Sequence, residues 1–327
     1  MFDFFSKMSR GKIGVALSSG GAKGLAHINV LEFLDEHDVK IDYIAGSSIG
    51  ALVGAVYYSG TLSQFKNEFG SFSWRDIVHL VDPVFPKSGI IAGKKIMKYL
   101  ERFIDPDVNI EELPGKLAIV ATDYFTGNPV IMREGNLLKA VRGSISIPGV
   151  FVPYDYDGRI LIDGGVANPI PVDVVKKMGA KRVVAVNLHP SAEVIQGKKK
   201  LKKLKNIAFR RKKRTMGNRI ASHIKINASG WFSFLSSYLK LDDDSDPNED
   251  PKGYEMPSII DVFMQSMEVM EYMNTFALLR YNKPSVLIEP AVREINGLDF
   301  DSGKEVLRIG QQAVEENRKK LLRKIVR

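Results

Sequence analysis

Short apolar segments alternate with longer amphipathic segments along most of the chain. Runs at residues 12–17, 116–124 and 182–188 are rich in Val, Ile, Leu and Ala and have the length of buried strands. Further strands are expected at residues 41–45, 129–132, 159–163 and 284–290. Helical segments separate many of these strands, and this alternation predicts an α/β fold with a mostly parallel sheet flanked by helices.

A Gly-x-Ser-x-Gly motif at residues 46–50 lies between a predicted strand and an apolar helix expected at 49–58. Strand, sharp turn and helix are the context of a nucleophile elbow, in which glycines keep bulk away from the serine. Ser48 would then stand at a helix N-terminus, where negative charge is favoured. The simpler alternative is a tight turn with an incidental serine, but the surrounding pattern favours a nucleophile.

A second glycine motif, at residues 19–24, follows the first strand and opens a helix expected at 23–36. Its Gly20 and Gly21 can present backbone N–H groups to a ligand oxygen. The Walker pattern is absent because Leu25 follows Gly24, and a dinucleotide fingerprint would need glycine in place of Ser19. We therefore interpret this loop as an oxyanion hole rather than a nucleotide site.

A third motif, Asp163-Gly164-Gly165, follows the strand at 159–162. Alone it would be an ordinary Asp-Gly turn, but with the two upstream motifs it predicts a catalytic carboxylate. Two alternatives remain for the base that activates Ser48. Asp163 takes the proton directly, or His189 completes a Ser-Asp-His triad in the chain order of α/β-hydrolases.

These motifs resemble those of the patatin-like phospholipase family, in its bacterial-type form, over about residues 12–190. Segments 121–127, 144–153 and 168–171 share the likeness. The resemblance implies a three-layer α/β/α fold and a Ser48–Asp163 dyad that hydrolyses acyl esters of phospholipids or lysophospholipids. By position, the implied oxyanion donors are Gly20, Gly21 and Ala22, and the supporting residues are Lys23, Gly24, Gly46, Gly50, Gly164, Gly165 and Asn168. Ser19 departs from the family loop, which usually has glycine there.

The formal net charge of +9 is concentrated in one segment. Residues 194–241 contain fourteen Lys and Arg and no Asp or Glu, so the rest of the chain carries a net charge of −5. The predicted division is an N-terminal extension 1–11, a catalytic core 12–190, a basic and amphipathic insert 191–257, and helices and a strand at 258–327 that complete the core. Residues 256–279 predict a long Met-rich helix, which we expect mainly as core.

The insert has three competing interpretations: a solvated loop, a nucleic-acid contact or a membrane anchor. We expect residues 196–241 to dock on anionic membranes, because a polybasic stretch precedes an aromatic amphipathic one at 231–239. Nucleic-acid binding is not favoured, since no recognition motif accompanies the charges. A non-catalytic tethering protein on a hydrolase fold is the main alternative to an enzyme.

The remaining composition bears on where in the cell the protein works and on whether it needs a metal or a cofactor. The chain has no cysteine, no apolar run long enough to span a bilayer and no signal-peptide pattern, so we expect a cytoplasmic protein with peripheral membrane association. Histidine and carboxylate spacings suggest no metal site, and no cofactor is expected. The oligomeric state is left open.

Overall fold

The computed structural model describes residues 11–84, 89–189 and 259–326. The chain divides into two compact units, residues 1–191 with 271–327, and residues 192–270. The strands are β1 (Ile13–Leu17), β2 (Tyr43–Ser47), β3 (Lys116–Asp123), β4 (Pro129–Met132), β5 (Tyr154–Tyr156), β6 (Arg159–Ile162), β7 (Arg182–Val186) and β8 (Val286–Ile288). The helices are η1 (Gly21–Leu25), α2 (Ala26–Glu36), α3 (Ile49–Tyr58), α4 (Leu62–Gly70), α5 (Trp74–Leu80), α6 (Lys94–Leu100), η2 (Ile110–Glu112), α7 (Leu137–Ser144), η3 (Gly164–Val166), α8 (Val172–Lys177), α13 (Ile259–Tyr281), η5 (Phe300–Ser302), α14 (Gly303–Leu321) and η6 (Leu322–Val326).

The eight strands form one mixed sheet in the order β5-β6-β3-β2-β1-β7-β8, with β4 also paired to β3. The run β3-β2-β1-β7-β8 is parallel throughout. Strands β4, β5 and β6 join it through antiparallel pairs at the β3 side. The predicted α/β class is confirmed, and the antiparallel wing is a feature that the apolar pattern did not predict.

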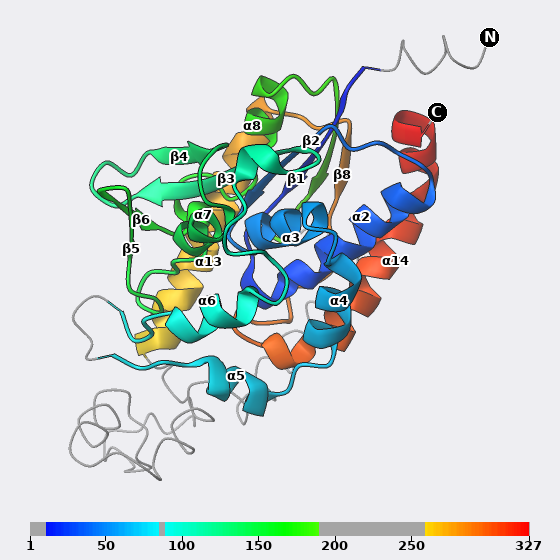
Figure 1. Ribbon diagram of the computed structural model, residues 1–327. Helices are drawn as coiled ribbons and strands as arrows, with labels where there is room; N and C mark the ends of the chain where they lie inside the picture. The colour runs from blue at the N-terminus through cyan, green and yellow to red at the C-terminus, as the bar shows by residue number, and fades with distance from the viewer. Residues whose placement is uncertain (1–10, 85–88, 190–258, 327) are drawn as a thin grey trace. The chain divides into compact units, whose positions relative to one another are not determined.

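Helices cover both faces of the sheet, because side chains of the central strands alternate between two apolar layers. On one face, Val15 and Leu17 of β1 pack with α2, α3 and α14. On the other, Ala16 packs with α8 and with Leu278 and Leu279 of α13. Figure 1 shows α2 and α14 side by side on the first face. This arrangement confirms the predicted three layers.

The face under α8 is lined by alanines in register. Ala16 pairs with Ala45 and Ala185, and Ala45 pairs with Ala118. Small side chains let a helix approach a sheet closely, and a Cβ on Gly14 would overlap Val175 of α8. The two layers therefore differ in depth, with the larger aliphatic side chains on the side of α2, α3 and α14.

The carboxyl ends of parallel strands meet at one edge of the sheet, which is where open α/β sheets bind ligands. The loop that begins at Ser18 follows β1, Ser48 follows β2, and His189 follows β7. Three of the four segments predicted to carry chemistry thus leave the sheet at this edge, and the fourth, at Asp163, follows the antiparallel strand β6.

Several predictions concern other parts of the chain. The Met-rich stretch forms α13 as a helix, but Met270 and Met273 are 58 % and 57 % exposed, and only Thr275 is buried among residues 262–281, so the expectation of a mainly core helix is wrong. The insert 191–257 and most of the N-terminal extension 1–11 lie outside the described residues. Within the described ranges, no helix is both long and apolar enough to cross a bilayer.

Candidate active site

Ser48 occupies the sharp turn between β2 and α3. Its backbone has φ 53° and ψ −122°, and it is the N-cap of α3. A positive φ at a residue other than glycine costs about 1–3 kcal/mol and persists only where the surroundings enforce it. A Cβ at Gly46 would overlap the backbone of Gly50, and one at Gly50 would overlap the carbonyl of Leu17. The motif therefore folds as a nucleophile elbow.

The backbone of Ser48 is held by a residue that the motifs did not reveal. Its N–H donates to Ser144 Oγ over 2.8 Å, and Ser144 Oγ donates to the carbonyl of Val120 over 2.6 Å. Ser144 is fully buried at the end of α7, and Val120 lies in β3. The elbow is thus fixed to the neighbouring strand through one hydroxyl group.

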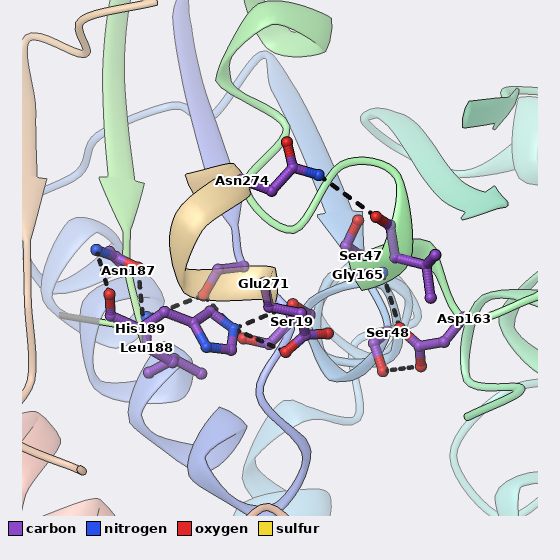
Figure 2. A network of polar contacts seen from close by, with 12 residues as sticks. Ser19, Ser47, Ser48, Asp163, Gly165, Asn187, Leu188, His189, Glu271 and Asn274 are labelled. Atoms are coloured by element: carbon purple, nitrogen blue, oxygen red, sulfur yellow. Dashed lines mark hydrogen bonds and ion pairs between the residues drawn. The ribbon is translucent and has the colours of Figure 1, made fainter. Parts of the chain in front are cut away.

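Asp163 faces Ser48 directly, as Figure 2 shows. Ser48 Oγ donates to Asp163 Oδ2 over 2.5 Å, and the N–H of Gly165 donates to Oδ1 over 2.8 Å. Both side chains are buried, with residues Ser48 and Asp163 only 4 % and 3 % exposed. Burial raises the pKa of the Asp163 carboxyl to about 6, while the bonds from Ser48 and Gly165 lower it. The carboxylate is therefore a stronger base than an ordinary aspartate.

The segment after Asp163 is tied to β2, β3 and the glycine loop. Thr122 Oγ1 of β3 donates to the Asp163 carbonyl over 2.8 Å, and Ser47 Oγ donates to the Asn168 carbonyl. Asn168 Nδ2 donates to Asp173 Oδ1 over 2.8 Å. This predicted supporting residue therefore stabilises the loop that follows Asp163 rather than contacting Ser48. The carbonyl of Pro169 accepts from the N–H of Ser19 over 2.9 Å, which joins the two motifs.

The backbone N–H groups of the glycine loop, residues 19–24, differ in whether they already have a hydrogen-bond acceptor. Gly20 has φ 149° and Gly21 has φ 57°, conformations that glycine adopts without strain. Among the described residues, the N–H groups of Gly20 and Gly21 have no hydrogen-bond acceptor. The N–H of Ala22 instead donates to Gly297 over 2.7 Å, so the expectation of Ala22 as an open oxyanion donor is not met. The loop after β8 supplies that carbonyl, and no sequence motif indicates that this loop lies against the glycine loop.

The remaining supporting residues pack the motifs together. Lys23 is buried within η1, at 2 % exposed. A Cβ at Gly24 would overlap Ile49 of the elbow helix, and one at Gly164 would overlap the carbonyl of Val120. Gly24 thus permits close approach of the glycine loop to the elbow helix, and Gly164 permits close approach of the turn after Asp163 to β3.

His189 belongs to a second group of polar side chains, beside the Ser48–Asp163 pair. Its Nε2 lies 3.1 Å from Ser19 Oγ and 3.4 Å from Glu271 Oε2 on α13. Burial and the charge of Lys23 lower the pKa of His189 to about 3, so the ring is neutral near pH 7. Figure 2 shows this group beside the Ser48–Asp163 pair, and no hydrogen bond links His189 to Ser48 or Asp163 among the described residues.

Comparison with known proteins gives this geometry a family. A model of the patatin-like phospholipase family matches residues 15–176, a range that contains Ser48, Asp163 and the glycine loop. Residues 15–176 belong to the patatin-like phospholipase family. The resemblance found from the motifs is therefore confirmed over these residues.

Relatives of the patatin-like domain are found in bacteria and animals. An uncharacterized NTE family protein of Mycobacterium tuberculosis is 41 % identical over 180 residues, covering 55 % of this chain and 50 % of that protein. Neuropathy target esterase sws of Drosophila melanogaster is 32 % identical over 198 residues, covering 58 % and 14 %. Human patatin-like phospholipase domain-containing protein 6 is 30 % identical over 194 residues, covering 56 % and 14 %. The chain thus spans half the length of the first relative and a small part of the other two.

Four polar residues support the patatin-like site without belonging to its glycine motifs: Ser144, Thr122, Glu271 and Asn274. Ser144 and Thr122 lie in segments that share the family likeness, but nothing in their sequence context indicates which group each contacts. Glu271 and Asn274 form an i, i+3 polar pair in a largely apolar helix. That spacing places both on one helix face and was the only available signal.

Proposed function

We propose that this protein is a serine lipid acyl hydrolase in which Ser48 is the nucleophile and Asp163 is its general base. The observation that carries the proposal is the 2.5 Å hydrogen bond from Ser48 Oγ to Asp163 Oδ2 within a nucleophile elbow. A serine needs a base within hydrogen-bond reach, and this carboxylate is within reach without an intervening imidazole.

The first half of the reaction forms an acyl-enzyme. Asp163 Oδ2 takes the proton of Ser48 Oγ as the oxygen attacks the ester carbonyl carbon, and the carbonyl oxygen becomes an oxyanion. The amides of Gly20 and Gly21 are the donors proposed for this oxyanion. Collapse of the tetrahedral intermediate breaks the ester C–O bond, and protonated Asp163 returns its proton to the leaving alcohol.

The second half releases the fatty acid. Water attacks the acyl carbon, Asp163 accepts a proton from that water, and a second tetrahedral intermediate forms against the same amides. When the bond to Ser48 Oγ breaks, Asp163 returns the proton to the serine. The carboxylate alternates between base and acid, for which a pKa raised to about 6 by burial is well suited.

The substrate we propose is a phospholipid or lysophospholipid at a membrane surface. The names of two relatives, neuropathy target esterase and patatin-like phospholipase domain-containing protein, support an ester of this class. Docking on anionic membranes through residues 196–241 remains a proposal from the sequence, since that segment lies outside the described residues. Peripheral membrane association in the cytoplasm is proposed on the same ground.

Fatty-acid release from mixed anionic liposomes tests the function. Wild-type protein should release fatty acid, whereas Ser48→Ala and Asp163→Asn should not, with unfolding temperatures measured for all three. Activity that survives in Ser48→Ala would refute the assignment. A folded wild type inactive both on these liposomes and on a soluble ester would favour the tethering protein instead.

A further inference from the structure

Helix α13 contacts both loops of the active site through residues one turn apart. Glu271 Oε2 lies 3.4 Å from His189 Nε2, which in turn lies 3.1 Å from Ser19 Oγ at the start of the glycine loop. Asn274 Nδ2 donates to the carbonyl of Ala167 over 3.0 Å and to that of Val166 over 3.4 Å. The second set of contacts lies on the turn that follows Asp163, as Figure 2 shows.

The chemistry of the first set fixes the tautomer of His189. Glu271 and Ser19 both face Nε2, and Nδ1 is buried with no hydrogen-bond partner in the described part of the chain. A carboxylate beside an unprotonated nitrogen would be repelled, so the hydrogen of the neutral ring is on Nε2 and points toward Glu271 and Ser19. In a Ser-His-acid triad the acid and the serine contact opposite nitrogens, so this group lacks the geometry of a general base.

The two loops touch where Glu271 meets them. A Cβ at Gly165 would overlap Glu271 Oε1 and would lie 2.8 Å from Ser19 Oγ. The N–H of Gly165 is the same group that donates to Asp163 Oδ1. The carboxylate of Glu271 therefore lies against the Asp163 turn on one side and the His189–Ser19 pair on the other.

We propose that Glu271 and Asn274 of α13 are positioning residues that hold the glycine loop and the Asp163 turn at their working separation, with His189 as the link to Ser19. The inference rests on the proposed function for its effect on turnover, but the placement itself can be tested without activity. In the part of the chain that the structure describes, the hydrogen bonds of Ser48 Oγ and of the Asp163 carboxylate involve neither side chain. Asn274 acts through the backbone of the turn after Asp163, and Glu271 acts through His189 and Ser19 on the glycine loop.

Other charged and titratable groups around His189 are Lys23 and His27, both of which lower its pKa. His27 is itself a buried neutral ring whose Nε2 lies 2.8 Å from the carbonyl of Ser18. No charged side chain contributes to the shifted pKa of Asp163, which arises from burial and from the bonds of Ser48 and Gly165. Changes on α13 therefore reach Asp163 through the Gly165 bond.

The test compares four variants of the full chain on a soluble short-chain ester, which removes membrane docking from the result. Glu271→Ala and Asn274→Leu should lower kcat about 10- to 100-fold with KM unchanged, the loss expected from small misplacement. Glu271→Gln keeps an acceptor for the Nε2 hydrogen and should recover most of the activity. Met273→Ala is the matched control, since Met273 lies between the two on the exposed side of the same helix turn and should behave as wild type.

Two further readouts separate positioning from general destabilisation. Asn274→Leu should move the rising limb of the pH–kcat profile above pH 6, because a displaced Gly165 no longer donates to Asp163, whereas Glu271→Ala should leave the limb in place. Amide hydrogen exchange should quicken at residues 163–168 in Asn274→Leu and at 18–25 in Glu271→Ala, at unchanged unfolding temperature. If Asn274→Leu does not fold, Asn274→Asp keeps the shape but places an acceptor against two carbonyls, and should give the same loss.

Each outcome decides the proposal. Normal kcat and normal exchange in both Glu271→Ala and Asn274→Leu would overturn it, and so would an equal loss in Met273→Ala. If wild-type protein hydrolyses no ester, the proposed function fails, and the exchange pattern still shows whether α13 holds the two loops.

Discussion

Two buried polar groups lie side by side in this molecule, and each pairs a serine with an acid. In one, Ser48 Oγ donates straight to Asp163; in the other, Ser19 and Glu271 both face the Nε2 of His189. Burial acts on both groups in the direction of the neutral form, which raises the pKa of Asp163 to about 6 and lowers the pKa of His189 to about 3.

The comparison shows that residue types alone do not identify a catalytic group. The Ser48–Asp163 pair has a strained serine and a carboxylate whose pKa is raised toward neutrality. The group around His189 has a ring too weakly basic to accept a proton near pH 7. Desolvation therefore makes the carboxylate of Asp163 more basic and the imidazole of His189 less basic than usual.

The largest expected effect is the difference in kcat between a variant of Asp163 and a variant of His189. Asp163→Asn should lower kcat about 10²- to 10⁴-fold, the usual contribution of a general base, while His189→Gln should stay within about 10-fold of wild type because Gln retains a donor near the Nε2 position. Steady-state kinetics on a soluble ester, with far-UV circular dichroism as the folding control, measure both. Comparable losses of kcat in the two variants would support a Ser48-Asp163-His189 triad instead of the dyad.

Gly165→Ala tests the boundary between the groups. The new methyl group would overlap Glu271 and crowd Ser19, so kcat should fall about 10- to 100-fold through displacement of the Asp163 turn. Adding Glu271→Ala to this variant removes the nearer obstacle and leaves the contact with Ser19, so the double variant should lose less activity than the product of the two single losses. A double variant with the full product of the two single losses would mean that the carboxylate and Gly165 act independently.

The pH dependence of kcat should follow Asp163 rather than His189. The proposed mechanism requires the ionised carboxylate, so kcat should rise about tenfold per pH unit below pH 6 and level off above it. His189→Gln should keep the same limb at a lower plateau. A limb that disappears in His189→Gln would assign the titration to the imidazole.

The smallest expected effect is a pair of opposite slopes in thermal stability. Asp163 has its pKa raised from 3.8, so its contribution to stability is complete below pH 3.8 and is lost as pH rises through 6. His189 has its pKa lowered from 6.5, so its contribution is complete above pH 6.5 and is lost as pH falls toward 3. The unfolding temperature of Asp163→Asn relative to wild type should rise between pH 4 and 7, and that of His189→Gln should fall, by a few degrees. Parallel slopes would contradict the opposite burial effects.

The sequence predicted the elements whose signal is local. The strand, Gly-x-Ser-x-Gly and helix around Ser48 fold as expected because glycines, apolar runs and helix propensity all act within about fifteen residues. The turn after Asp163 follows from the same kind of local pattern. The antiparallel wing of β4, β5 and β6 did not, because short strands carry no mark of their direction.

Contacts between distant segments could not be predicted from one chain. Ser144 holds the N–H of Ser48 from 96 residues away, and Gly297 occupies the N–H of Ala22 although its segment has no motif. The role of His189 depended on which nitrogen faced which partner, a matter of tertiary packing. Glu271 and Asn274 lie on α13, whose Met-rich composition predicted a core helix rather than contacts with the active-site loops.

The most direct test of the central claim is the rate at which a fluorophosphonate modifies Ser48 in wild type and in Asp163→Asn, followed by peptide mass spectrometry at pH 7.5. The reagent reports the activation of the hydroxyl without requiring the natural lipid. If Asp163 is the base, wild-type protein gains one adduct at Ser48 and the variant reacts at least about 10²-fold more slowly. Equal labelling of Ser48 in the two proteins would contradict the dyad.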